Sequence, residues 1–408
     1  MLDPARIMER CDALARHSEL PGGLTRVFLS PQARAATDKV LGWMREAGMQ
    51  AKLDAIGNAA ARYEGDRPGL ACLMLGSHLD TVRDAGRYDG MLGVISAIEC
   101  VSFLNSQKKR LPFAIEVIGF GDEEGVRFGT TLLGSRAVAG TLDLEVLKMK
   151  DPQGNTMADA LRGFGLDPQR IPELARKKGD VLAYAELHIE QGPVLEAEGL
   201  AVGIVTAING FSRLRVTLGG TAGHAGTVPM NLRRDALAGA AECVLATERI
   251  AKGHAELVGT VGRIEARPGA INVIPGEVSF TVDVRAPQDP LRKHAVAAVR
   301  AEIEEICRKR QLKSEIELLQ EFGVTRCAPW LMEQMDKAVA RQGFRVRRLP
   351  SGAGHDGMAL GAITDICMLF VRCKGGISHS PLESIAREDA AAGANVLLDF
   401  IENFRLPA

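Results

Sequence analysis

The chain has 408 residues, with 50 lysines and arginines against 51 aspartates and glutamates, which gives a net charge of −1 at pH 7. Such an even balance excludes the basic footprint of a nucleic-acid-binding protein and the polybasic patch of a membrane-surface protein. A chain of this length exceeds a comfortable single hydrophobic core, so we expect two domains.

We expect neither a membrane span nor a signal peptide in this sequence. Every apolar run is shorter than the roughly 18 residues of a membrane span, and the first residues, MLDPARIMERCD, lack the apolar core of a signal peptide. The eight cysteines are scattered without a C-x-x-C pair, which favours buried, reduced thiols. We therefore expect a cytoplasmic protein.

The first part of the chain alternates between strand and helix patterns. In chain order these are a helix at 31–48, a strand-like stretch at 49–63, an apolar strand at 70–80, a helix at 91–107 and a buried strand at 113–120. This alternation predicts an α/β domain with a central, mostly parallel sheet. In such sheets, sites form beyond the carboxyl ends of the strands.

The middle of the chain has a different order of elements. The patterns there are a strand at 212–220, a helix at 233–253, two strands at 258–268 and 276–287, a helix at 289–310 and a strand at 314–322. This order predicts a small α+β domain of about 115 residues inserted into the larger one. We therefore assign residues 1–209 and 326–408 to the larger domain and 210–325 to the insertion.

Three of the eight histidines stand in polar motifs at predicted strand ends: His78 in GSHLD, His188 in ELHIEQGP and His379 in GGISHSP. A lone histidine is more often a hydrogen-bonded structural residue than a ligand. Three of them beside carboxylates and glycines reverse that expectation. Imidazole and carboxylate ligands suit zinc, manganese or similar ions, so the sequence predicts a metal site.

Four carboxylates accompany these histidines. Asp80 lies two residues after His78, on the same side of a strand, where it can accept the ring N–H and orient the imidazole. Asp89, in a glycine-containing loop, could bridge two ions. Glu123 and Glu124 are adjacent and point to opposite faces of an extended backbone, so we expect one to bind metal and the other to move a proton.

Together the motifs H-x-D, D-G, E-E, H-I-E-Q-G-P and G-I-S-H resemble those of the dinuclear metallo-amidohydrolases related to the aminoacylase and carboxypeptidase exopeptidases. The resemblance covers nearly the whole chain. The stretches LHIEQGPVLE, GHAGTVPMNLRRDAL and SGAGHDGMA are similar to the branch that hydrolyses ureido compounds. It implies a metallopeptidase-like catalytic domain, an inserted lid that also forms a homodimer, and a small ureido-carboxylate substrate.

The resemblance also implies roles for particular residues. It assigns two divalent ions, zinc or manganese, to two ligand sets: His78, Asp89 and His188 for one ion, and Asp89, Glu124 and His379 for the other. Glu123 would be the general base that deprotonates a water held between the ions and returns the proton to the leaving nitrogen. Asp80 would support catalysis from behind His78.

The implied substrate contacts come from both domains. His224 would stabilise the oxyanion, and Arg285 would bind the substrate carboxylate through its two parallel N–H groups. The remaining contacts implied are Gln191, Asn272, Gly354 and His355. Without the resemblance, Arg285 would be interpreted as a strand residue in a surface salt bridge, and His355 could simply order its loop.

Within the branch, FGDEEGVRFGTTLLGSRAVAGT and MLFVRCKGGISHSP look most like allantoate amidohydrolases. The expected reaction converts allantoate to ureidoglycine, ammonia and carbon dioxide, as in purine degradation. An N-carbamoyl-L-amino-acid hydrolase or a β-ureidopropionase is the alternative, since those substrates offer a carboxylate and one ureido group. A metal-binding scaffold without activity is a remote alternative, because every ligand and the base are present.

Overall fold

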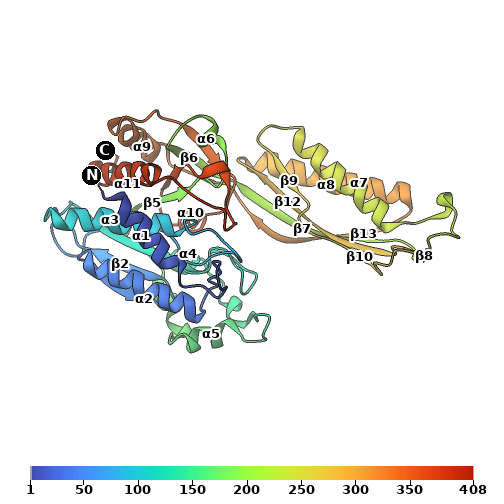
Figure 1. The fold of residues 1–408 in the computed structure, drawn as a ribbon, viewed down its shortest axis with the longest axis horizontal. Coiled ribbons are helices and arrows are strands. Elements are labelled where there is room, and N and C mark those ends of the chain that lie inside the picture. The colour runs from blue at the N-terminus through green and yellow to red at the C-terminus, as the bar shows by residue number, and fades with distance from the viewer. Residues whose placement is uncertain (1, 408) are drawn as a thin grey trace. The chain divides into compact units, whose positions relative to one another are not determined.

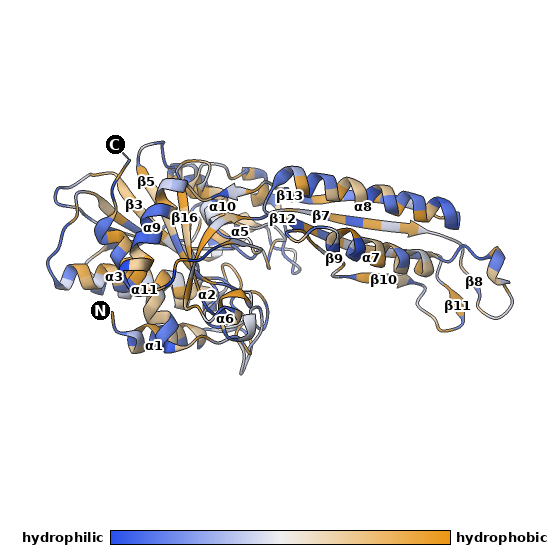
Figure 2. Ribbon diagram, turned by 90° about the horizontal axis from the view of Figure 1, so that it is seen from above, coloured by the Kyte–Doolittle hydropathy of each residue, from blue (hydrophilic) through white to orange (hydrophobic). Residues whose placement is uncertain are grey.

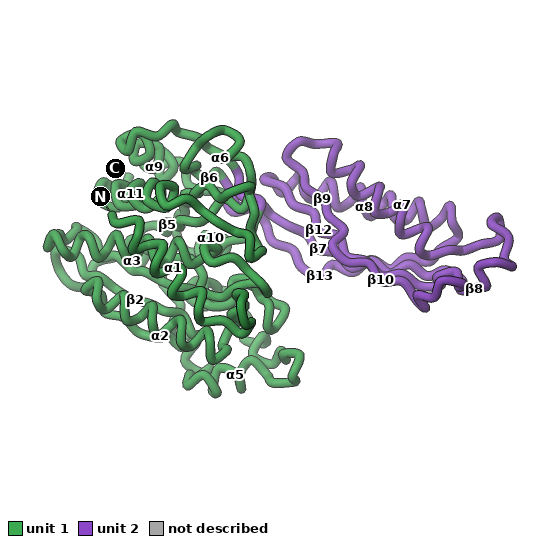
Figure 3. The backbone as a smooth tube through the Cα atoms, viewed as in Figure 1, with its two compact units in different colours: residues 1–206, 326–349, 353–408 green, residues 207–325, 350–352 purple. Residues whose placement is uncertain are grey.

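The computed structural model describes residues 2–407, which divide into two compact units (Figure 3). Unit 1 contains the residues up to 206, residues 326–349 and those from 353 onward, and unit 2 contains residues 207–325 and 350–352. The short piece 350–352 joins unit 2 by its contacts, although no sequence pattern indicated it. No helix within residues 2–407 is long and apolar enough to cross a membrane.

Unit 1 is built on a nine-stranded sheet with the order β1-β2-β4-β3-β5-β16-β6-β14, and β15 pairs with β6. The strands are β1 (Gln50–Leu53), β2 (Ala59–Tyr63), β3 (Cys72–His78), β4 (Ala114–Phe120), β5 (Val181–Ile189), β6 (Val202–Ile208), β14 (Thr325–Arg326), β15 (Arg348–Ser351) and β16 (Ile366–Val371). The central strands β4, β3, β5 and β16 run parallel to one another. This confirms the predicted α/β class with a mostly parallel central sheet.

Helices cover this sheet (Figure 1). They are α1 (Pro4–Ala15), α2 (Pro31–Glu46), α3 (Met91–Ser106), α4 (Leu133–Val138), α5 (Met157–Gly163), α6 (Val194–Ala197), α9 (Pro329–Arg341), α10 (Gly357–Leu360) and α11 (Arg387–Asn403). Helix α3 packs against β3, β4 and β5, and α11 packs against α3 and β16. Both helices are buried along most of their length, so they hold the central strands in a fixed register. All eight cysteines are free and buried, as predicted.

Unit 2 is an antiparallel sheet with two helices packed on it. Its elements are β7 (Gly210–Gly219), β8 (Gly223–His224), α7 (Ala236–Lys252), β9 (Val258–Thr260), β10 (Ile264–Arg267), β11 (Val273–Ile274), β12 (Glu277–Ala286), α8 (Asp289–Arg310) and β13 (Lys313–Phe322). The main sheet has the order β10-β12-β7-β13, with β9 also on β12, and β8 and β11 form a separate ribbon.

The alternation of apolar and polar residues explains how unit 2 packs. In β12, residues 278, 280, 282 and 284 are buried against α7 and α8, while the residues between them are only partly buried. Helix α8 has apolar and polar positions in turn along its length (Figure 2), and its apolar side meets the sheet. The other face of the sheet carries polar side chains that pair with one another, such as Arg213 with Asp283 and Arg215 with Glu317.

Candidate metal centre

The predicted ligand residues meet at one edge of the central sheet. His78 is the last residue of β3, His188 lies at the end of β5, and Glu123 and Glu124 follow the end of β4 by three and four residues. His379 follows β16 after a short turn. Since β4, β3, β5 and β16 are adjacent and parallel, their carboxyl ends share this edge.

Asp89 is the centre of the cluster, because its two carboxylate oxygens face different histidines. Oδ1 lies 3.2 Å from His188 Nε2 and 3.7 Å from His78 Nε2. Oδ2 lies 3.1 Å from His379 Nε2, and that nitrogen is 3.4 Å from Glu124 Oε1. The geometry thus gives two possible ligand groups that share the Asp89 carboxylate, His78–Asp89–His188 and Asp89–Glu124–His379. A further group, His78–Glu123–Glu124, lies beside them.

The spacing of these atoms fits metal ions. Ligands at 2.0–2.2 Å from a tetrahedral zinc lie about 3.3 Å from one another, and the distances between Asp89 and its histidines are 3.1–3.7 Å. Asp89, Glu123 and Glu124 form no ion pair with a lysine or arginine anywhere in residues 2–407. Buried carboxylates without such partners need another source of positive charge, which divalent cations would supply when bound.

The pKa values of His78, Asp89 and Glu124 are shifted by burial and by the charges of their neighbours. Burial alone would lower the pKa of His78, but the contact with Asp89 and the nearby carboxylates raise it well above its usual range. Burial would raise the pKa of Asp89, yet its three histidines hold it well below the ordinary value. Burial and the charge of Asp89 raise the pKa of Glu124 to about 7. The pKa of His78 is raised by neighbouring carboxylates against the effect of burial, and the pKa of Glu124 is raised by burial and by Asp89, so the site concentrates negative charge in a buried place.

Asp80 makes a different contact from the predicted one. His78 Nδ1 lies 3.0 Å from the backbone oxygen of Asp80 and 3.9 Å from its carboxylate, so the main-chain carbonyl orients the imidazole. The Asp80 carboxylate instead accepts the backbone N–H groups of Glu123 at 3.0 Å and of Glu124 at 3.1 Å. It therefore fixes the turn on which both glutamates stand.

Three residues at this edge adopt left-handed backbone conformations: Asp122 with φ 59°, Gln191 with φ 56° and His379 with φ 54°. Gln191 had been predicted to bind substrate, and its side-chain amide donates to both oxygens of Asp89 at 3.2 Å. The side chain of Gln191 therefore lies against the shared carboxylate. Such conformations cost free energy outside glycine and are found where surrounding contacts over-determine the backbone.

His355 and Gly354 lie on either side of the cluster. His355 is fully buried, and its ring centroid lies 4.5 Å from that of His188, which favours the structural alternative for this residue. A Cβ atom on Gly354 would meet Glu123 Oε1 at 3.4 Å, so this glycine borders the glutamate.

The sequence interpretation missed Glu186, which is fully buried and groups with His188 and His355. Its carboxylate accepts the hydroxyls of Ser77 at 2.9 Å and Tyr184 at 3.0 Å. Glu186 lies two residues before His188 in β5, so the strand period places both on one face. That period could have revealed it.

In unit 2, the predicted substrate residues occupy two places. His224 pairs with Val273 across the β8–β11 ribbon, and the Asn272 backbone oxygen accepts the Ala225 N–H at 3.0 Å, so His224 and Asn272 lie together. Arg285 lies near the C-terminal end of β12, whereas the ribbon precedes the N-terminal end of that strand. It donates through Nε and Nη2 to Asp283 at 3.1 and 2.8 Å.

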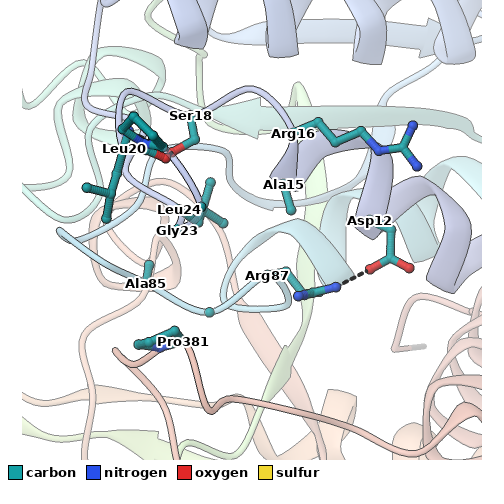
Figure 4. A pocket seen from close by; sticks show the side chains of 13 residues that line it. Asp12, Ala15, Arg16, Ser18, Leu20, Gly23, Leu24, Ala85, Arg87 and Pro381 are labelled. Carbon is teal, nitrogen blue, oxygen red and sulfur yellow. Dashed lines mark hydrogen bonds and ion pairs between the residues drawn. The ribbon is translucent and has the colours of Figure 1, made fainter.

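A separate cavity lies apart from the cluster. It has a volume of about 670 Å³ and is lined by the end of α1, the loop of residues 18–24, the loop of residues 85–87 and Pro381 (Figure 4). Arg87 pairs with Asp12 at its rim at 2.7 Å. None of the metal-ligand candidates lines it, although its walls come from the loops that precede Asp89 and follow His379.

A parallel α/β sheet with clustered histidines and carboxylates at its carboxyl edge is an arrangement typical of metal-dependent enzymes. The chain matches peptidase family M20/M25/M40 over residues 74–403. It is 43% identical over 398 residues to an N-carbamoyl-L-amino acid amidohydrolase of Geobacillus stearothermophilus, covering 97% of each chain. It is 41% identical to a probable allantoate deiminase of Oryza sativa subsp. japonica, covering 96% of this chain and 87% of the relative.

The crystal structure of an amidase of the hydantoinase/carbamoylase family from Burkholderia multivorans superposes with a TM-score of 0.89 at 35% identity, covering 98% of this chain and 97% of that chain. The chain therefore belongs to peptidase family M20/M25/M40. It is a hydrolase that acts on C–N bonds.

Proposed function

We propose that this enzyme hydrolyses the ureido group of a small carboxylate, allantoate in the first place, with two divalent metal ions. The observation that carries the proposal is the division of the Asp89 carboxylate, with one oxygen toward His78 and His188 and the other toward His379. A shared carboxylate of this kind suits two neighbouring ions. The relatives named as allantoate deiminase and N-carbamoyl-L-amino acid amidohydrolase support the ureido substrate.

The two glutamates divide the remaining work. When bound, divalent ions polarise a carbonyl and lower the pKa of water. Glu124 groups with Asp89 and His379, which supports its role as a ligand. Glu123 also lies near His78, but it has no part in either group that contains Asp89, and it borders Gly354. We assign Glu123 as the base, which takes a proton from water and delivers it to the leaving nitrogen.

The guanidinium of Arg285 is held in an orientation that suits binding of a substrate carboxylate. Asp283 accepts from its Nε and Nη2, and the Gly352 backbone oxygen accepts from Nη1 at 2.9 Å. These three contacts fix the guanidinium plane and leave two of its five N–H groups for a ligand. The salt bridge expected of a structural arginine is thus present, and it orients the group for substrate.

His224 and Arg285 of one chain lie too far apart to bind the same substrate. Arg285 pairs with Phe211 near one end of β12, and the other end at Glu277 is about 27 Å away at about 3.4 Å a residue. The β8–β11 ribbon with His224 lies beyond that far end (Figure 2). Allantoate spans six bonds between its terminal nitrogens, roughly 8 Å. We infer that the two residues serve different active sites, which requires a second chain.

A mixed-dimer experiment tests this arrangement. We expect His224→Ala and Glu123→Gln to be inactive alone, and co-expression of the two chains with different tags to restore about a quarter of the wild-type activity, since one site in each heterodimer is intact. Co-expression of Asp89→Asn with Glu123→Gln is the matched control and should restore nothing, because both residues belong to unit 1. If the first pair also restores nothing, His224 acts within its own chain.

The substrate is tested directly. With manganese or zinc supplied, we expect kcat/KM for allantoate to exceed that for N-carbamoyl-L-amino acids by at least about tenfold, or about 1.4 kcal/mol. Ammonia release is the measurement, and a Glu123→Gln preparation corrects for contaminating enzymes. Rapid hydrolysis of N-carbamoyl-L-amino acids without turnover of allantoate would establish the alternative. Turnover of neither substrate would leave only the alternative that the chain is a metal-binding scaffold without activity.

A further inference from the structure

Glu383 is a buried carboxylate outside the predicted ligand sets, four residues after His379 and only 4% exposed. Its Oε1 accepts the backbone N–H groups of Tyr88 at 2.8 Å and of Asp89 at 3.2 Å. Its Oε2 accepts the hydroxyl of Ser378 at 3.0 Å. All three hydrogen bonds therefore end on a metal-ligand candidate or on its direct neighbour.

These bonds tie together two loops that are far apart in the sequence. One loop carries Asp89, ahead of α3, and the other carries His379, after β16. Gln191 extends the connection, because its amide donates to the Ser378 hydroxyl at 3.3 Å as well as to Asp89. The relative position of Asp89 and His379, which face the same ion in the proposed centre, thus depends on Glu383.

The surroundings make room for this carboxylate. A Cβ atom on Gly86 would lie 2.1 Å from Glu383 Cδ, and the φ angle of Gly86 is not positive, so this glycine is required for space and not for its backbone conformation. On the outer side, the loops at 85–87 and at Pro381 border the cavity of Figure 4. The 85–87 loop is also anchored by the Ala85 N–H, which donates to the Leu24 carbonyl at 2.7 Å, and Glu383 adds the bonds that link this part of the chain to the loop of His379.

A buried carboxylate is an expensive way to join two loops. Glu383 forms no ion pair with a lysine or arginine in the described part of the chain, and burying a charge without a partner costs free energy. A neutral side chain could tie the loops at lower cost. Carboxylates behind metal ligands, by contrast, orient those ligands and strengthen metal binding.

We propose that Glu383 is a positioning residue of the metal centre, which holds Asp89 and the loop of His379 at the separation that lets both reach one ion. The proposal rests on the proposed function, because it presumes that these two residues bind metal. It adds a residue that contacts neither the ion nor the substrate. Gly86 is part of the same arrangement, because its lack of a side chain leaves room for the Glu383 carboxylate.

Metal affinity of the purified full-length enzyme is the measurement. We expect Glu383→Ala to raise the metal dissociation constant, obtained by titration against a competing chelator, by about 10–100-fold. Glu383→Gln should lose less, because its amide oxygen still accepts both backbone N–H groups. Gly86→Ala should reproduce the loss with the carboxylate in place, since its methyl group displaces Glu383.

Two controls separate positioning from folding. Glu388→Ala removes an exposed glutamate five residues away, and Gly42→Ala adds a methyl group where no atom lies within 4 Å; both should bind metal as the wild type does. Thermal unfolding of the metal-free variants reports the structural effect separately. Wild-type metal affinity in Glu383→Ala and Gly86→Ala would overturn the proposal. Failure of the wild-type enzyme itself to bind two ions would instead overturn the proposed function.

Discussion

Glu123→Gln is expected to lower kcat by a factor of about 10²–10⁴ while both metal ions remain bound. Glutamine has the shape of glutamate but cannot accept a proton, so the change removes the base and keeps the packing. Because Glu123 lies outside both groups that contain Asp89, metal content should not fall. The measurement is turnover with saturating metal, together with metal analysis of the dialysed protein.

The exposed Glu388 on α11 offers a matched control. Glu388→Gln makes the same chemical change at an exposed position outside the ligand groups and should leave kcat unaltered. Unchanged turnover in Glu123→Gln would refute its assignment as the base. Loss of an ion in that variant would show that Glu123 is a ligand and would shift the search for the base to Glu124.

Asp89→Asn is expected to weaken the binding of both metal ions, whereas Glu124→Ala should weaken the binding of only one. Asp89 offers one oxygen to each ligand group, and asparagine keeps a single, uncharged oxygen. The loss of affinity should exceed the roughly 10–100-fold that partners behind the ligands cost. The stoichiometry of bound metal in the two variants, measured on dialysed protein, distinguishes the outcomes.

A result in which Asp89→Asn loses one ion and keeps the other would contradict a shared carboxylate. His188→Ala serves as the complementary variant, because His188 faces Oδ1 of Asp89 and, of the two groups that share Asp89, belongs only to the first. It should lose the ion that Glu124→Ala retains. Together the three variants assign each ion to its ligands without a crystal structure.

The fold class and the position of the site could be predicted from the sequence for a simple reason. Buried parallel strands appear as continuous apolar runs, and polar residues directly after such runs must gather at one edge of the sheet. His78 and Glu123 follow two of these runs, and His188 closes a third. Local patterns therefore carried the information on which residues meet.

The partners of individual side chains could not be predicted in the same way. Asp80 binds backbone amides more than 40 positions later in the sequence, and Glu383 binds amides that precede it by almost 300. Periodicity tells which face a residue occupies, but not which loop comes to lie opposite. For Asp80 the prediction of a bond to the imidazole of His78 was wrong, because the carbonyl of Asp80 occupies that position.

The left-handed backbones of Asp122, Gln191 and His379 have a consequence for how this enzyme tolerates change. At about 1–2 kcal/mol each, they cost the fold about 3–6 kcal/mol, a large part of the 5–15 kcal/mol by which a typical domain is stable. Glycine at these positions would relieve the cost but would also remove the side chains of Gln191 and His379, which contact Asp89. Selection for thermal stability alone would therefore favour variants that are more stable but lack side chains of the metal centre. Stabilising substitutions that preserve catalysis must be sought away from this edge of the sheet.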